Sequence, residues 1–396
     1  MRERADAVVI GGGIMGASVA HFLVKLGYGE VVLVEKSRIC GGSTQYSAAH
    51  VRQHYTNEVA IRLAVRAAEM FANDEEAFGG PTGFTRHGYM VIAPEEQADA
   101  IRQVVPVQQA LGVRTEVLTV EEIAHRWPAL ALDGVALGCY EETSGYADPV
   151  LTVQTLVDTA KQRGLTVYEG CRVLGIHVER GRVSGVVTGD GEIATDVVVN
   201  ATGPWGNEVG RMVGIEYPLR FSREHEAIFE APADLGAFPV MSDAVQRLYF
   251  RHYGTGRVLV GEGWPKEPEP ADPDRYDDGT DEEHLGRMVP KLVRRLPALA
   301  ERLGEPGYGG AFVTGYSGIY DITEDWYPVV GEEEVEGYYS AFGGSGHCFK
   351  IGPTIGESLA HVIAGLEPPI DISSLSGRRF AEGRTFSSVW GPGNRA

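Results

Sequence analysis

Three glycines and one glutamate near the N-terminus have the spacing of a dinucleotide-binding site. Gly11, Gly13 and Gly16 form the pattern GxGxxG, and Glu35 follows nineteen residues after Gly16. Gly11 permits a tight turn, Gly13 lets the backbone approach a pyrophosphate, and Gly16 lets a helix pack closely on a sheet. A carboxylate about 20 residues further on accepts hydrogen bonds from a ribose diol. These residue types predict recognition of a dinucleotide, without deciding which one.

The surrounding sequence supplies the elements that would position these residues. Residues 7–10 and 31–34 are short apolar runs, and each predicts a buried strand. A helix begins at the glycines and ends at Gly27, and its N-terminus would offer N–H donors to a pyrophosphate. A signal peptide or membrane span is the alternative for this apolar segment. It is disfavoured because four glycines interrupt the run and because His21 and Lys25 lie inside it.

Composition limits the class of protein. The chain has 396 residues, enough for two domains or one large interleaved unit, and a net charge of −20. This charge argues against nucleic acid or anionic membranes as partners, and an anionic substrate would need a local cation. The four cysteines show no CxxC spacing, which predicts a reducing compartment, no metal site and a cytoplasmic location.

Four later segments have recognisable patterns. Residues 40–54 form a Gly/Ser-rich loop, and residues 56–78 predict a helix that Thr56 could cap. Residues 352–365 predict a second helix with Pro353 in its first turn. Residues 265–283 are rich in Pro, Asp and Glu, which predicts a solvated surface loop rather than a site.

Six motifs spread over the chain resemble the D-amino-acid-oxidase-like superfamily of FAD-dependent amine oxidoreductases. The likeness is greatest to sarcosine oxidases and to the β-type subunits of dimethylglycine and proline dehydrogenases. A nicotinamide dehydrogenase would not need the last two motifs, so the resemblance favours FAD over NAD. The motifs are GGGIMG (11–16), GGST (41–44), VRQHY (51–55), NATGPW (200–205), GIYDITEDWYPVVG (318–331) and GGSGHCFK (343–350).

The resemblance implies a mixed α/β fold with two interleaved domains. A Rossmann-like FAD-binding domain would comprise residues 1–80, 145–215 and 325–396. A substrate domain on a mixed antiparallel sheet would comprise residues 81–144 and 216–324. The cofactor-binding residues predicted from motif and resemblance together are Gly11, Gly13, Ile14, Met15, Gly16, Glu35, Lys36, Gly42, Ser43, Thr44, Ser47, Ala49, His50, Val173, Ala201, Thr202, Gly203, Trp205, Gly344, Gly346, His347 and Lys350.

Four residues are predicted for the chemistry from the same resemblance. Lys350 matches a family lysine near the flavin that promotes reaction with oxygen, since a fixed cation stabilises the developing negative charge; the alternative is an ordinary surface lysine. Arg52 matches an arginine that binds the substrate carboxylate, although it could instead form a structural salt bridge. Tyr249 and Tyr320 match tyrosines on the substrate side. The helix at Pro353 would direct its N-terminus at the reduced ring.

Departures from the family pattern narrow the prediction. Glycine oxidase and D-amino acid oxidase have an arginine where this chain has Tyr320, which argues against both activities. Gly263 replaces a histidine of monomeric sarcosine oxidase, so the amine pocket should differ. Gly318 and Tyr46 occupy the positions of flavin-linking residues and cannot form the bond, which predicts non-covalent FAD. Cys348 could react with the flavin, but inert packing is the alternative.

The sequence thus predicts FAD-dependent oxidation of a secondary amine that carries a carboxylate, such as an N-alkyl glycine or a cyclic imino acid. Hydride would pass to flavin N5, the imine would hydrolyse, and O2 would reoxidise the flavin to give H2O2. The first alternative is a dehydrogenase subunit that passes electrons to a partner subunit. The others are a module that binds FAD structurally and a glycine or D-amino acid oxidase.

Overall fold

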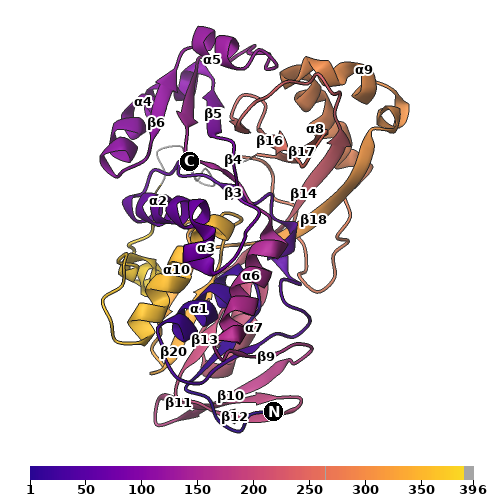
Figure 1. Cartoon of the computed structure of the whole chain (residues 1–396). Helices are drawn as coiled ribbons and strands as arrows, with labels where there is room; N and C mark the ends of the chain where they lie inside the picture. Colours follow the sequence, from indigo (N-terminus) through magenta and orange to yellow (C-terminus); the bar gives the residue numbers. More distant parts are fainter. Residues whose placement is uncertain (264, 388–396) are drawn as a thin grey trace.

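Two large sheets dominate the computed structural model, which describes residues 1–263 and 265–387. The sheets lie towards opposite ends of the molecule, and each has its own hydrophobic core (Figure 1). One sheet takes its strands from residues 7–34, 166–200 and 329–342, and the other from residues 89–141 and 220–322. The mixed α/β class and the interleaving of two units are therefore confirmed. The domain boundaries given above stay a prediction.

The first sheet has six strands in the order β19-β20-β13-β1-β2-β9. All neighbours are parallel except β19 and β20, which are antiparallel. Alternate residues of β1 enter different cores: Val9 packs with the helices on one face, and Val8 packs with a three-stranded meander on the other. Because both faces are covered, the central strands are continuous apolar runs. The strands are β1 Ala7–Ile10, β2 Val31–Val34, β9 Thr166–Tyr168, β13 Val198–Asn200, β19 Val329–Glu332 and β20 Tyr338–Phe342, and the meander is β10 Val173–Glu179, β11 Arg182–Thr188 and β12 Gly191–Ala194.

Four helices cover the other face of this sheet. Helix α1 (Ile14–Lys25) packs against α10 (Cys348–Ile363) and α6 (Pro149–Gln162), and α2 (Glu58–Ala72) packs on α10. Two predicted helix starts are wrong. Asn57, not Thr56, caps α2 by accepting from Val59 N at 3.0 Å. Helix α10 starts at Cys348, so Pro353 lies inside it and Lys350 lies in its first turn.

The second sheet has eight strands in the order β18-β14-β17-β16-β15-β5-β7-β6. Every pair is antiparallel except β15 with β5, which makes the sheet mixed as expected. Helix α8 (Glu282–Arg295) contributes Met288 and Leu292 to the core of this sheet. The strands are β5 Tyr89–Ala93, β6 Thr115–Leu118, β7 Leu137–Glu141, β14 Arg220–Glu230, β15 Val240–Asp243, β16 Leu248–His252, β17 Arg257–Glu262 and β18 Phe312–Ile322.

A small sheet of three short strands, in the order β3-β8-β4, accompanies the two large ones. In the described part of the chain, no helix is both long and apolar enough to cross a bilayer. The remaining elements are β3 His50–Val51, β4 Thr85–Arg86, β8 Gly145–Tyr146, α3 Asp74–Phe78, α4 Glu95–Ala110, α5 Val120–Arg126, α7 Gly206–Gly210, α9 Ala300–Leu303 and α11 Arg378–Ala381.

Candidate active site

One cavity of about 630 Å³ is lined by residues of both large sheets. Gly11 and Glu35, at the carboxyl ends of β1 and β2, line one part of it, and Tyr249 and Tyr320 of the second sheet line another. All of the residues predicted for cofactor or substrate line this cavity except Gly16. Ligands of open α/β sheets bind at the carboxyl ends of the strands, which is where this cavity begins.

The glycine turn has no space for side chains. Gly11 has φ +105°, and a Cβ there would lie 2.5 Å from the carbonyl oxygen of Ala201. A Cβ on Gly16 would lie 1.9 Å from the carbonyl oxygen of Gly11, so this glycine serves helix packing, as predicted, and not the cavity wall. Thr44 accepts a hydrogen bond from Ile14 N at 3.1 Å and so fastens the following loop to the start of α1.

The ribose-binding candidate Glu35 is held by the backbone at the end of β2. Its Oε2 accepts from Gly12 N at 2.8 Å, and its Oε1 accepts from the backbone N and hydroxyl of Ser37 at 2.8 and 3.0 Å. The first turn of α1 contains no acidic residue. A helix N-terminus without a competing carboxylate suits a pyrophosphate, because its N–H groups and dipole favour an anion.

Residues 265–281, here called the strap, contact the predicted cofactor residues. Asp274 in the strap accepts from Trp205 Nε1 at 2.8 Å and lies 3.4 Å from Lys36 Nζ. Lys36 Nζ also lies 3.3 Å from the centroid of the Trp205 ring. Tyr46 donates to Asp278 Oδ2 at 2.8 Å. The strap is largely exposed, as predicted, and it also contacts residues predicted to bind the cofactor, which its composition did not indicate.

Lys350 is a buried lysine in the wall of the cavity, which excludes the surface-lysine alternative. Its side chain is in the first turn of α10, and its Nζ donates to the carbonyl oxygen of His347 at 2.8 Å. The His347 ring contacts Trp326 O through Nε2 at 2.7 Å and Tyr55 Oη through Nδ1 at 3.0 Å. Because the Trp326 carbonyl can only accept, Nε2 carries the proton and Nδ1 accepts from Tyr55. Tyr55 itself is fully buried.

Arg52 presents a guanidinium to the cavity, and the buried Glu141 acts on it electrostatically without forming an ion pair. The group stacks 4.3 Å from the centroid of the Tyr55 ring, and Nη1 donates to the carbonyl oxygen of His54. Within residues 1–263 and 265–387, no carboxylate forms an ion pair with it. The structural salt bridge considered as its alternative is therefore not formed there. A guanidinium whose remaining donors line a cavity can bind an anionic ligand through a bidentate pair of hydrogen bonds.

A buried carboxyl group that sequence reasoning missed lies beside Tyr249. Glu226 of β14 accepts from Tyr249 Oη at 3.0 Å and from Tyr316 Oη at 2.6 Å. Burial raises the pKa of Glu226 to about 7, against the opposing effect of the two hydroxyl donors. Gly261 of β17 lies between β14, which carries Glu226, and β16, which carries Tyr249. A Cβ on Gly261 would be 2.2 Å from the Tyr249 ring. The two acids at alternate positions of β14, Glu224 and Glu226, were the signal that could have revealed this group.

Two further side chains near this end of the cavity are His50, which has a nitrogen without a hydrogen-bond partner in the described part of the chain, and Asp321, which accepts a backbone hydrogen bond. His50 packs edge-on against Tyr249 with 5.4 Å between ring centroids, and its buried Nε2 has no hydrogen-bond partner among the described residues. Burial lowers the pKa of His50 well below its usual range, and the nearby Arg251 cation acts in the same direction. Asp321 accepts from Gly343 N at 2.8 Å and fixes the glycine loop, on which the Tyr320 ring packs at Gly346.

Comparison with known proteins decides the family. A model of the family described as FAD dependent oxidoreductase matches residues 6–362. The chain belongs to this family. The cofactor is therefore FAD, and the protein is an oxidoreductase that uses it.

Relatives of this FAD-dependent oxidoreductase include two curated proteins that are considerably longer. Human mitochondrial sarcosine dehydrogenase is 30% identical over 398 residues, which are 98% of this chain and 42% of that protein. The 4-methylaminobutanoate oxidase (formaldehyde-forming) of Paenarthrobacter nicotinovorans is 27% identical over 387 residues, which are 94% of this chain and 45% of that protein. The chain thus spans less than half the length of either.

A solved structure of similar size has the same fold. The crystal structure of L-proline dehydrogenase from P. horikoshii superposes with a TM-score of 0.87 at 29% identity, covering 97% of this chain and 99% of that one. This match supports the predicted likeness to proline dehydrogenases.

The cavity fits FAD at its dinucleotide end. The glycine turn, which a Cβ would fill, can cradle the pyrophosphate, and Glu35 can accept from the ribose. The two positions that carry flavin-linking residues elsewhere in the family lie side by side, since a Cβ on Gly318 would be 2.8 Å from that of Tyr46. Because neither residue can form the link, FAD binding without a covalent bond at these positions is consistent with the structure. Cys348 is buried in the cavity wall.

Proposed function

We propose that this protein oxidises a small secondary amine that bears a carboxylate, such as an N-alkyl glycine or a cyclic imino acid. The observation that carries the proposal is Arg52, a guanidinium that lines the cavity and forms no ion pair with a carboxylate of the described residues. The three relatives named above support it. Sarcosine, 4-methylaminobutanoate and proline are each a secondary amine with a carboxylate.

Several side chains of the cavity would have defined roles in this reaction. Bound FAD would accept a hydride from the carbon next to the amine nitrogen. Arg52 would bind the substrate carboxylate through two parallel hydrogen bonds and so fix the orientation of the substrate. Tyr249 and His50 form the wall next to Glu226, and Tyr320 packs against the glycine loop at Gly346. These residues would hold the amine against the cofactor.

Glu226 supplies a place for the amine proton. A secondary amine is an ammonium ion at neutral pH, whereas hydride loss requires the neutral amine. The hydroxyl of Tyr249 already donates to Glu226, so it could take the ammonium proton while passing its own proton to the carboxylate. Because burial raises the pKa of Glu226 to about 7, this group can both hold and release a proton near neutrality.

Two oxidants for the reduced cofactor are compatible with the cavity. The buried Lys350 cation would stabilise the negative charge that forms when O2 is reduced to H2O2, which favours an oxidase. The likeness to L-proline dehydrogenase over 99% of that chain favours the alternative, a dehydrogenase that passes electrons to a partner subunit. We place the oxidase first because Lys350 is buried in the cavity wall.

Matched substrate pairs test the proposal. The FAD-loaded protein is mixed anaerobically with sarcosine and dimethylamine, or with proline and pyrrolidine, and bleaching of the flavin absorbance is followed. Faster bleaching by the member of each pair that has a carboxylate is the expected result, and equal bleaching would contradict the role of Arg52. Glycine and D-alanine should react poorly. Rapid recovery of colour in air identifies an oxidase, while recovery with a dye alone identifies the dehydrogenase.

A further inference from the structure

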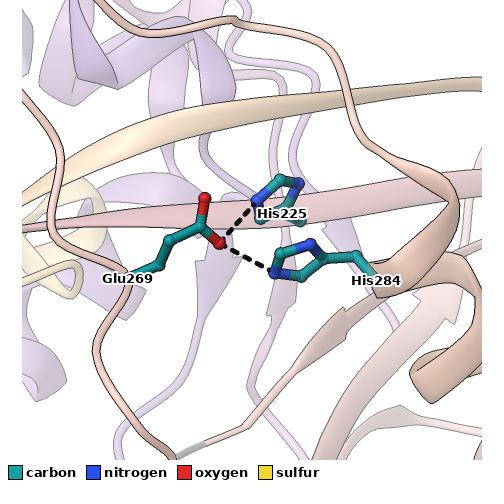
Figure 2. A group of neighbouring side chains, drawn as sticks. All are labelled: His225, Glu269 and His284. Atoms are coloured by element: carbon teal, nitrogen blue, oxygen red, sulfur yellow. Dashed lines mark hydrogen bonds and ion pairs between the residues drawn. The ribbon is translucent and has the colours of Figure 1, made fainter.

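Two buried histidines and one glutamate meet on the second sheet at a place that does not line the cavity (Figure 2). His225 belongs to β14, His284 lies near the start of α8, and Glu269 comes from the strap. The Nε2 atoms of His225 and His284 lie 3.2 and 3.1 Å from the same oxygen, Oε2 of Glu269. The rings are nearly parallel, with 3.3 Å between their centroids.

The outer hydrogen bonds of the cluster turn both Nε2 atoms inward. Nδ1 of His284 lies 2.8 Å from Asp281 Oδ1, and because a carboxylate only accepts, the proton is on Nδ1. Nδ1 of His225 lies 3.1 Å from the hydroxyl of Thr280, which can accept in the same way. In the neutral tautomer, the Nε2 lone pair of His284 then faces a carboxylate oxygen. Such a pair repels unless a proton or a metal cation lies between the two atoms, and the titration with Co²⁺ described below distinguishes the two.

We propose that His225, His284 and Glu269 bind one divalent transition-metal ion of the zinc class. Two ligand atoms about 2.0–2.1 Å from an ion are roughly 2.9–3.4 Å apart at angles between 90° and tetrahedral. The distances of 3.1 and 3.2 Å lie in that range. Imidazole nitrogens and one carboxylate are a ligand set that zinc accepts, and a metal-binding histidine usually donates its other N–H to an oxygen, as His284 does to Asp281.

The surrounding charges allow such an ion. Arg223 donates to Glu269 Oε1 at 3.0 Å and also lies 3.3 Å from Asp281 Oδ2, so one cation faces two carboxylates. With neutral imidazoles the cluster has a net charge of −1, which a divalent ion would reverse. Glu269 is partly exposed, so water can complete the coordination from its side. Binding would tilt the two rings apart from their present stack.

The ion would fasten the strap that contacts the cofactor residues. Glu269 is the ligand that the strap supplies, and five residues later Asp274 hydrogen-bonds to Trp205. The other two ligands are on β14 and α8, outside the strap. A bound ion would therefore tie the strap to the second sheet and slow the release of FAD. The scattered cysteines gave no indication of such a site, because none of its ligands is a cysteine.

Cobalt binding tests the site on the full-length, FAD-loaded protein. After treatment with a chelator and dialysis, Co²⁺ is titrated and its visible absorption recorded, with Zn²⁺ as competitor. We expect one ion per chain, lost in the Glu269→Gln and His284→Gln variants. The Asp281→Asn variant should bind about 10- to 100-fold more weakly, because a neutral amide oxygen replaces the carboxylate that accepts the His284 N–H. The flavin absorbance and circular dichroism show that each variant is folded.

A matched control uses the exposed pair of His177 and Glu192, whose Nε2 and Oε2 atoms lie 3.4 Å apart. The His177→Gln variant should bind Co²⁺ like the unaltered protein. Equal binding by the unaltered protein and the Glu269→Gln variant, or no binding by either, would overturn the metal site.

The role of the ion in fastening the strap is tested by measuring the rate of FAD release with Zn²⁺ and with chelator. Slower release with Zn²⁺ is expected, and equal release would overturn the fastening role.

Discussion

The two ends of the cavity recognise their ligands by different means. At the dinucleotide end, the wall is mostly backbone: Gly11 and Gly13 leave no side chain in the way, and the carboxylate of Glu35 is itself held by main-chain N–H groups. At the substrate end, the wall consists of buried ionisable side chains, namely Arg52, Glu226 and their neighbours. The first end is fixed by steric fit, and the second by charge and protonation.

Because of this difference, the two ends should tolerate different substitutions and respond differently to pH. A cradle made of backbone should fail when any atom is added, and pH should not affect it. A wall of buried charges should tolerate changes in size but respond to changes in charge and in pH. The following variants test this contrast, beginning with the largest expected effect.

Gly16→Ala should abolish FAD binding. The added Cβ would lie 1.9 Å from the Gly11 carbonyl oxygen, so α1 must move away from the turn. Overpacking of this kind costs about 1–3 kcal/mol or more. The measurements are the amount of FAD per chain after gel filtration and the thermal midpoint of unfolding.

Gly189→Ala is the control for that variant, because a Cβ there meets no atom within 4 Å. It should retain FAD and its thermal midpoint. If Gly16→Ala binds FAD as well as Gly189→Ala does, the steric account of the dinucleotide end is wrong.

Arg52→Ala should weaken substrate use while leaving FAD in place. Removing one partner of a buried charge pair costs about 2–5 kcal/mol, which lowers the rate of flavin reduction at low substrate concentration by about 30- to 5,000-fold. Anaerobic stopped-flow with proline or sarcosine measures this rate.

Two controls sharpen that result. Arg52→Lys keeps the charge but loses the planar fork, so its rate should lie between those of the other two proteins. Arg62→Ala removes an exposed arginine paired with Glu58 and should leave the rate unchanged. A carboxylate-free amine should react equally with the Arg52→Ala and unaltered proteins, and a large difference there would argue against direct binding of the carboxylate.

Glu226→Gln should change the pH dependence. In the unaltered protein kcat/KM should rise as the pH increases through about 7, because Glu226 must be ionised to accept the amine proton and burial raises its pKa to that value. The glutamine variant should lose this rise and be about 10²-fold slower above it, near the lower limit for general-base catalysis. A variant that keeps the same rise would show that another group titrates.

Asp274→Ala should have the smallest effect. It removes the acceptor of the Trp205 N–H and the exposed partner of the half-buried Lys36. A single hydrogen bond contributes about 0.5–1.5 kcal/mol, so FAD should dissociate about 2- to 10-fold faster. Asp274→Asn keeps an acceptor and should release FAD at nearly the original rate. Release that is equally fast from both variants would assign the effect to charge.

Most of the dinucleotide end of the cavity could be predicted from the sequence. The strands at residues 7–10 and 31–34 have the predicted bounds, and Gly27 follows α1 with φ +73°. These features are local, since glycines, apolar runs and one acid follow one another within thirty residues. The start of α10 was misplaced because Pro353 matched a first-turn position, whereas the helix continues through it from Cys348.

The substrate end could not be found from local patterns. Glu226, Tyr249 and Tyr316 come from β14, β16 and β18. Only the pairing of β14 with β18, and of β17 with both β14 and β16, brings them together. The contacts of the strap could not be predicted for the same reason. Its composition is that of a solvated loop, and its contacts with Trp205 and Tyr46 depend on how the two sheets are placed.

The strand order of the first sheet determines when this sheet can form during biosynthesis. Strand β1 is synthesised well before its neighbour β13, which follows about 190 residues later, and β20 completes the pairing near residue 340. A nascent chain therefore displays the whole glycine motif long before the sheet beneath it can close. Capture of the coenzyme must therefore follow the synthesis of β20. Until then the sheet that contains the apolar strands β1 and β2 is incomplete, and these strands are exposed to aggregation.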